Sequence, residues 1–205
     1  MGDIFEGATM RIGIAGAQSV GKTTLLNALR SEPIFKNYQI CNEVTRRVKS
    51  YGLPINEQGN DITQRLIMQE HIVNVFMYPD MITDRTALDG IVYSAYMLAL
   101  KQISEETYQY ADKVFEKVLP YYDLLFYIEP EFEIVDDGIR STDKKFRNDI
   151  IKIFNEAIDI KLVKVHRVKG TVRERVEQVL NVVEEYNGQS TKTKRAGRSS
   201  SRKSG

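Results

Sequence analysis

The sequence predicts an α/β fold of three layers, in which a parallel five-stranded sheet lies between two layers of helices. Short apolar runs alternate along the chain with longer segments whose apolar residues recur at helical spacing. Apolar residues occupy both faces of these runs, which indicates strands that are buried on both sides. Right-handed crossovers would then bring the carboxyl ends of the strands to one edge of the sheet, where open α/β sheets bind ligands.

The alternation begins in the first quarter of the chain. Residues 10–15 form an isoleucine-rich apolar run, and 22–30 carry leucines and an alanine at helical spacing, with a glycine-containing loop between them. A second apolar run, 38–41, indicates another strand. Residues 43–51 then indicate a short helix that ends before a glycine and a proline.

The segment 61–77 is expected to form an amphipathic helix capped by Asp61. One helical face of this segment is apolar apart from Gln69. Its apolar members are Ile62, Leu66, Val73, Phe76 and Met77. Such a stripe is typical of a helix that packs on a core.

Apolar runs and helical periodicity continue to alternate after a turn at Pro79. The remaining strands are expected at 81–83, 124–128 and 162–165. The remaining helices are expected at 88–100, 105–118, 143–158 and 172–186. The last helix is expected to end at Asn187-Gly188, because a glycine after asparagine is a common helix stop.

Length and composition favour one globular domain with a tail. The 205 residues are 42% hydrophobic and 28% charged, enough apolar surface for a core without a membrane-spanning run. We expect a domain at 1–188 and a disordered basic tail at 189–205, because 192–203 hold six basic residues and no acidic one. A single cysteine, Cys41, and the lack of an apolar leader favour a reducing, cytoplasmic setting.

The phosphate-binding pattern G-x-x-x-x-G-K-[ST] is matched by Gly16-Ala17-Gln18-Ser19-Val20-Gly21-Lys22-Thr23, between an expected strand and an expected helix. In this context the pattern predicts a P-loop, whose backbone N–H groups surround phosphate oxygens. Lys22 would contact the β and γ phosphates, and the Thr23 hydroxyl would ligate Mg²⁺. Thr24, the next residue of the nucleotide-binding segment, is interpreted as a first-turn helix residue. ATP and Mg²⁺ are the expected ligands.

Other residues separate the classes of P-loop protein. A guanine-reading Asn-Lys-x-Asp segment and an Asp-x-x-Gly switch motif are missing from the sequence, which disfavours a GTPase. A motor ATPase would usually show an Asp-Glu pair at the end of a core strand. Here the third expected strand is followed by Asp84-Arg85-Thr86.

With these motifs the chain resembles the nucleoside and nucleotide kinases of the P-loop class, in particular their phage-type and ribosylnicotinamide-kinase-like members. The resemblance covers about residues 10–187. Besides the P-loop, it rests on Glu43 after the second strand, Asp84-Arg85 followed by Asp89 and Tyr93, and Asp137-Gly138-Ile139-Arg140 before a helix that carries Arg147.

The resemblance implies roles for several of these residues. It implies Glu43 as the candidate base, Asp84 as a carboxylate on the metal side, and Arg85 as a clamp on the acceptor. It also implies a lid at about 130–148 whose arginines, Arg140 and Arg147, close on the transferring phosphate. Carboxylates and arginines suit phosphoryl transfer, which depends on positioning and on cations around the phosphate.

Other interpretations stay open for these residues. Glu43 could be a carboxylate that stabilises a helix start, and Arg140 and Arg147 could be solvated charges. His71 and His166 are expected to be structural, whereas Tyr93 is a candidate for the site because it lies one helical turn after Asp89.

Three functions are compatible with the sequence. The first is an ATP- and Mg²⁺-dependent kinase that phosphorylates a nucleoside or nucleotide-like acceptor. The second is a DNA kinase acting on a modified base, such as 5-hydroxymethyluracil, or on a strand end; the basic tail could contact this nucleic acid. The third is a nucleotide-gated switch that has no acceptor.

Overall fold

The computed structural model describes residues 9–42, 44–55, 58–131 and 144–200, with side chains described as far as residue 189. The five strands are β1 (Arg11–Ala15), β2 (Gln39–Cys41), β3 (Met81–Asp84), β4 (Leu124–Ile128) and β5 (His166–Val168). The helices are α1 (Lys22–Leu29), α2 (Val44–Ser50), α3 (Asp61–Met77), α4 (Ala87–Ala99), α5 (Glu105–Val118), α6 (Lys144–Ile160) and α7 (Val172–Ser200). Short 3-10 helices lie at Pro33–Phe35 and Leu119–Tyr121.

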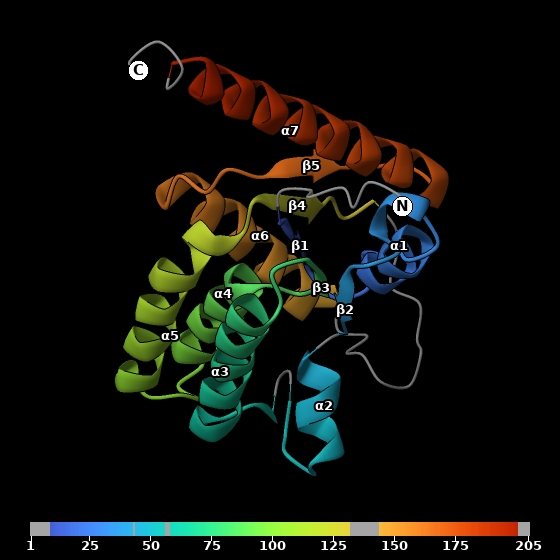
Figure 1. The fold of residues 1–205 in the computed structure, drawn as a ribbon. Helices are drawn as coiled ribbons and strands as arrows, with labels where there is room; N and C mark the ends of the chain where they lie inside the picture. Colours follow the sequence, from blue (N-terminus) through green and yellow to red (C-terminus); the bar gives the residue numbers. More distant parts are fainter. Residues whose placement is uncertain (1–8, 43, 56–57, 132–143, 201–205) are drawn as a thin grey trace.

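The five strands form one parallel sheet in the order β2-β3-β1-β4-β5. Helices α1 and α7 contact each other on one face of the sheet, and α3 to α6 form the layer on the other face (Figure 1). This arrangement confirms the predicted α/β fold. The register pairs Ile14 of β1 with Asp84 of β3, so Asp84 lies next to the strand that enters the P-loop.

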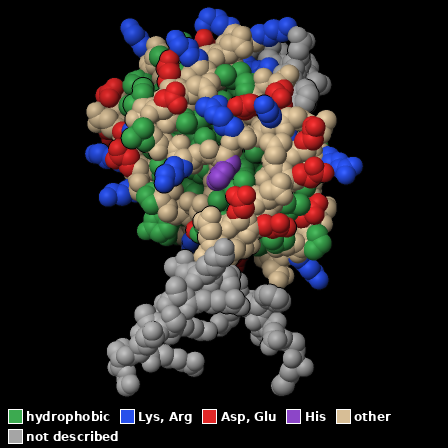
Figure 2. Space-filling model, turned by 90° about the horizontal axis from the view of Figure 1, so that it is seen from above, with side chains coloured by type: hydrophobic (Ala, Val, Ile, Leu, Met, Phe, Trp, Pro, Cys, Tyr) green, Lys and Arg blue, Asp and Glu red, His purple; other side chains and the backbone are tan. Residues whose placement is uncertain are grey.

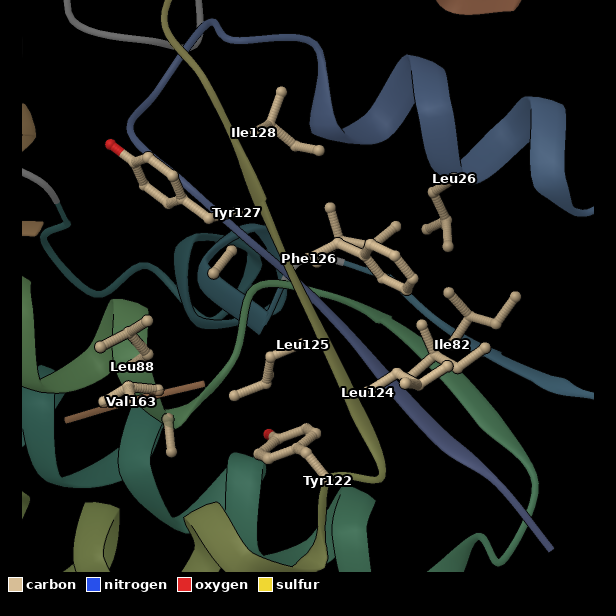
Figure 3. Packing of buried hydrophobic residues seen from close by; sticks show 14 of the residues in the cluster. Leu26, Ile82, Leu88, Tyr122, Leu124, Leu125, Phe126, Tyr127, Ile128 and Val163 are labelled. Carbon is tan, nitrogen blue, oxygen red and sulfur yellow. The ribbon is translucent and has the colours of Figure 1, made fainter. Parts of the chain in front are cut away.

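Side chains of β4 alternate between the two helix layers. Leu124, Phe126 and Ile128 point to the side of Leu26 on α1, whereas Leu125 and Tyr127 point to the opposite side (Figure 3). All five residues of β4 are buried. The strand is therefore hydrophobic at consecutive positions because both of its faces contact helices.

The helix α3 has the predicted bounds, but its orientation differs from the prediction. Its N-cap is Asn60, which forms a reciprocal capping box with Thr63, rather than Asp61. Four residues of the predicted buried stripe are 48 to 65% exposed: Ile62, Val73, Phe76 and Met77. The opposite face, which includes Gln64 and His71, is buried instead. The expectation of an apolar stripe packed on the core is therefore wrong for most of this stripe.

Two predictions near the C-terminus are also wrong. The fifth strand is His166–Val168 rather than 162–165, because β4 pairs with 166–168 and Leu162 is 85% exposed with a positive φ. The closing helix continues through Asn187-Gly188 to Ser200, so residues 189–200 of the predicted disordered tail are helical. A single glycine costs a helix only about 1 kcal/mol, and no proline follows it. Residues 201–205 lie outside the described residues.

The face of the molecule drawn in Figure 2 carries both signs of charge. Lysine and arginine side chains are interspersed with aspartate and glutamate over this face (Figure 2). In the described part of the chain, no helix combines the length and the apolar character needed to cross a membrane.

Candidate functional site

The P-loop connects β1 to α1 at the carboxyl edge of the sheet. Gly16 and Gly21 have φ angles of 148° and 91°, which favour glycine, and a Cβ on Gly16 would lie 3.1 Å from the Ile128 carbonyl oxygen. Gly21 is the N-cap of α1 and offers no side chain to the first-turn N–H groups. The loop therefore presents a helix N-terminus, the arrangement that binds phosphate groups.

Lys22 folds back over the P-loop from the first turn of α1. Its Nζ atom donates to the carbonyl oxygens of Gly16 at 2.7 Å and Ala17 at 2.6 Å. The side chain is buried. The ammonium group is thus held above the loop, where a phosphate chain would lie. Thr24 is on the exposed side of α1.

Thr23 and Asp84 meet where α1 begins and β3 ends. The Thr23 hydroxyl donates to Oδ2 of Asp84 at 2.5 Å, and Asp84 is 1% exposed. The other carboxylate oxygen, Oδ1, is buried and has no hydrogen-bond partner among the described residues. A hydroxyl and a carboxylate with a spare oxygen are ligands that suit Mg²⁺.

These two residues do not form a metal cage made of protein alone. The described ranges contain no group of three or more His, Cys, Asp or Glu residues that could hold a metal ion. Mg²⁺ usually binds through one or two protein oxygens together with substrate phosphates and water. The donor set of Thr23 and Asp84 therefore fits the magnesium ion that the P-loop motif implies.

Arg85 follows β3 in a strained backbone conformation. Its φ is 75°, an uncommon value for a residue that is not glycine. The buried guanidinium lies over the ring of Tyr93 at 4.9 Å, and its Nη1 atom is 3.9 Å from Oδ1 of Asp89. Strain of this kind is common at functional sites, where it directs a side chain.

Asp89 ties the P-loop to α4. Its Oδ1 accepts from the Gly16 N–H at 3.3 Å, and its Oδ2 accepts from the Thr86 N–H and hydroxyl at 2.9 and 3.0 Å. Burial raises the pKa of Asp89, whereas the positive charges of Lys22 and Arg85 lower it. Asp89 was not among the predicted catalytic residues. The T-x-x-D spacing indicates only a helix cap, and the contact with Gly16 spans 73 residues of sequence.

Tyr93 connects α4 to the P-loop side chains. Its hydroxyl donates to Oε1 of Gln18 at 2.9 Å, and both residues are buried. The Tyr93 ring also contacts Phe146 of α6 edge-on. The Tyr93 side chain therefore joins α4 to the P-loop.

A pocket lies beside Arg85, Asp89 and Tyr93. Its other lining residues come from α2, α3 and α4 and are Thr45, Gln64, Ile67, His71, Gly90 and Met97. Both polar and apolar side chains line the pocket, and its volume is about 20 Å³, room for about one water molecule. It opens next to the residues that surround the P-loop.

Two polar side chains of this pocket are buried without complete hydrogen bonding. Within the described chain, Oε1 of Gln64 and both ring nitrogens of His71 have no hydrogen-bond partner. Burial, and to a smaller extent the charge of Arg85, lowers the pKa of His71 to about 3. His71 is therefore neutral near pH 7, with one N–H donor and one acceptor nitrogen. No feature of the sequence indicates that His71 faces a pocket.

The structure does not place every predicted residue. Glu43 and Arg140 lie outside the described residues, as does most of the predicted lid. Arg147 is in the first turn of α6 and is only 9% exposed, and desolvation lowers its pKa. The alternative interpretation of Arg147 as a solvated charge is therefore wrong.

Comparisons with known proteins bear on the fold and the family. No curated protein gives a significant sequence match. Among solved structures, the chain is similar to a NadR protein in complex with NR, with a TM-score of 0.66 and 21% identity over 88% of this chain and 52% of that chain. It is also similar to a deoxyadenosine kinase from M. mycoides with the products dCMP and a flexible dCDP bound, with a TM-score of 0.63 and 16% identity over 86% of this chain and 99% of that chain.

These similarities establish the fold. The chain spans about half the length of the NadR chain it matches and nearly the whole length of the deoxyadenosine kinase. A family model described as AAA domain matches residues 11–175. The resemblance to P-loop proteins that the motifs predicted is confirmed, and the chain belongs to the AAA domain family.

Proposed function

We propose that this protein is an ATP- and Mg²⁺-dependent kinase that transfers the γ-phosphate to a hydroxyl group of a nucleoside or nucleotide-like acceptor. The proposal rests mainly on one observation: a pocket lined by Arg85, Asp89 and Tyr93 lies directly beside the P-loop. A switch protein would need no second pocket at this position. The proposal is supported further by the kinase named among the similar folds.

The described residues divide into a donor side and an acceptor side. Lys22 would stabilise negative charge on the transferring phosphate, and Thr23 and Asp84 would hold Mg²⁺. A bound Mg²⁺ would neutralise charge on the β and γ phosphate oxygens. Arg85 would bind the acceptor side, because its guanidinium borders the pocket.

Three further roles rest on the resemblance alone. Glu43 is proposed as the base that receives the proton from the acceptor hydroxyl. Arg140 and Arg147 are proposed as the arginines that approach the transferring phosphate, as the family pattern implies. Arginine suits this role because its planar guanidinium can bind two phosphate oxygens at once.

The pocket favours an acceptor that has a flat heterocycle with hydrogen-bonding atoms. Ile67 and Met97 offer apolar contacts, whereas Gln64 and His71 offer the unpaired oxygen and nitrogens. A base of a nucleoside would satisfy these atoms once the lining side chains move apart, because the cavity of about 20 Å³ is smaller than a base. Leaving the atoms unpaired is costly. A purely apolar or purely hydroxylated acceptor would match the pocket less well.

A pair of substitutions on α3 tests this acceptor site. Gln64→Leu should raise the Michaelis constant for the acceptor about tenfold and change that for ATP less than twofold, because one hydrogen bond to the base is removed. Gln69→Leu is the matched control, since Gln69 is exposed on the same helix. Steady-state kinetics on both substrates measures the two constants. Equal effects of Gln64→Leu on both Michaelis constants would show that Gln64 does not bind the acceptor.

DNA remains a second candidate acceptor. The observation that favours it is the basic run 192–203, of which residues through Ser200 continue α7 as a helix. A basic helix can contact phosphates of a nucleic acid without reading its sequence. A switch without an acceptor is the third candidate; it would hydrolyse ATP at the same slow rate with and without acceptors.

A further inference from the structure

Arg175 lies at the start of α7, where its position is fixed by a reciprocal cap. The Thr171 N–H and hydroxyl donate to Oε2 of Glu174 at 2.7 and 2.8 Å, and the Glu174 N–H lies 3.4 Å from the Thr171 hydroxyl. The Arg175 N–H donates to the Thr171 carbonyl as the first helical bond. The backbone at Arg175 is therefore fixed from the first turn of α7.

The Arg175 side chain reaches the P-loop although the two are 155 residues apart. Nη1 donates to the Val20 carbonyl oxygen at 2.6 Å, and Nε donates to the Gly170 carbonyl oxygen at 2.8 Å. Nη2 is 3.3 Å from a carboxylate oxygen of Glu131. The residue is 2% exposed, so these bonds are shielded from water. Charged hydrogen bonds of this kind are stronger than neutral ones.

The bond to Val20 determines the direction of the next N–H group in the P-loop. A trans peptide bond holds its C=O and its N–H in one plane, pointing in opposite directions. Because Arg175 binds the Val20 carbonyl from the α7 side, the Gly21 N–H points the opposite way, away from Arg175. That N–H is one of the donors that a P-loop offers to phosphate oxygens.

Gly21 makes this restraint necessary. Its φ of 91° is accessible to glycine at little cost, but glycine also populates many other conformations. The Val20–Gly21 peptide could therefore rotate readily if nothing held it. In addition, Nη1 of Arg175 lies 3.1 Å from the position of a Cβ on Gly21, so the guanidinium contacts this residue closely.

We propose that Arg175 is a positioning residue of the nucleotide site, which keeps the Gly21 N–H directed at the phosphates by holding the Val20 carbonyl. The inference rests on the nucleotide binding contained in the proposed function, and it needs neither the acceptor nor catalysis. Its consequence is that α7 and the turn at Gly170 contribute to nucleotide affinity without touching the phosphates.

Binding of ATP with Mg²⁺ in the absence of acceptor, measured by calorimetry, tests this role. Arg175→Met, which keeps the length of the side chain but removes the donors, should weaken nucleotide binding about tenfold or more. Arg175→Lys, which keeps the charge without the planar guanidinium, should remain weakened several-fold. Arg173→Met is the matched control with wild-type affinity, because Arg173 has a 90% exposed side chain two residues earlier in α7.

A second measurement separates positioning from a general loss of stability. In ¹H–¹⁵N spectra, the shift of the Gly21 amide signal on adding nucleotide should be smaller in Arg175→Met than in the wild type. If Arg175→Met does not fold, Arg175→Lys provides the same comparison.

Wild-type affinity and an unchanged Gly21 signal in a folded Arg175 variant would overturn the inference and leave the proposed function intact. A wild-type protein that binds no ATP would overturn the proposed function itself.

Discussion

At the scale of single residues, Lys22 holds the most direct position over the phosphate site. Lys22→Ala should lower the turnover number about 100-fold or more, because charge on the transferring group loses its nearest cation. The substitution also frees the carbonyl oxygens of Gly16 and Ala17, so circular dichroism must verify that the variant is folded. A folded variant with near-normal turnover would contradict the assignment of the site.

Substitution of Asp84 tests the proposed Mg²⁺ site. Asp84→Asn keeps the size of the side chain but removes the charge, so the Mg²⁺ concentration needed for half-maximal activity should rise about tenfold. Titration of activity with Mg²⁺ measures this change. Asp149→Asn is a control on the exposed side of α6, where Asp149 pairs with Lys145. An unchanged magnesium requirement in Asp84→Asn would remove Asp84 from the metal site.

The lowered pKa of buried His71 makes the stability of the fold depend on pH. Its pKa is about 3 in the folded protein and about 6.5 when unfolded, so the unfolded state binds more protons between these values. The free energy of unfolding should therefore fall as the pH drops below about 6.5. At pH 5 the loss of stability caused by His71 should be about 2 kcal/mol. The charged groups beside His71 in the pocket are Arg85 and Asp89.

Denaturant unfolding at pH 7.5 and pH 5 checks this prediction. His71→Leu should lose less stability between the two pH values than the wild type, because it lacks the buried imidazole. Equal losses for wild type and His71→Leu would mean that His71 is not buried in its neutral form.

At the scale of elements, the helix α3 shows where sequence patterns stop being informative. Its bounds followed from periodicity, but most of its predicted apolar stripe faces outward, and its buried face mixes polar residues such as Gln64 and His71 with apolar ones such as Met68. The amphipathic rule fails here because Gln64 and His71 line a pocket, and functional sites are where such rules are broken. Neither the pocket nor the partners of α3 can be found from one sequence.

The helix α7 is longer than its sequence pattern predicts, because it continues through a glycine that usually ends a helix. Its length gives the basic run a helical form through Ser200, which changes how the tail can be tested. Deletion of 189–205 should leave the Michaelis constant for a small nucleoside unchanged, because the residues assigned to chemistry precede residue 148.

If DNA is the acceptor, the same deletion should weaken DNA binding. The slope of log affinity against log salt should then flatten by about 0.7 to 0.9 for each DNA phosphate that the tail no longer neutralises. Binding titrations at several salt concentrations measure this slope. A truncated, folded protein that loses activity on a small nucleoside would contradict both versions, since the tail would then be part of the active site.

At the scale of the whole molecule, the predictable part of the site was the part that is local in sequence. The P-loop motif directly follows β1, Asp84-Arg85 stands at the end of β3, and the parallel sheet brings them together at one edge. Asp89 with Gly16, Tyr93 with Gln18, and Arg175 with Val20 are long-range pairs, and they depend on how helices pack. Their individual spacings carry no signal of these contacts.

Phosphate transfer to an acceptor is the property that distinguishes a kinase from a nucleotide-gated switch. The most direct measurement is incubation with γ-labelled ATP and Mg²⁺ in the presence of free nucleosides, nucleotides or modified DNA, with mass spectrometry of the products. We expect a phosphorylated nucleoside-like product, ATP consumption that depends on this acceptor, and loss of both with Lys22→Ala. Slow release of inorganic phosphate at a rate that no acceptor changes would contradict the proposed kinase activity and favour a nucleotide-gated switch.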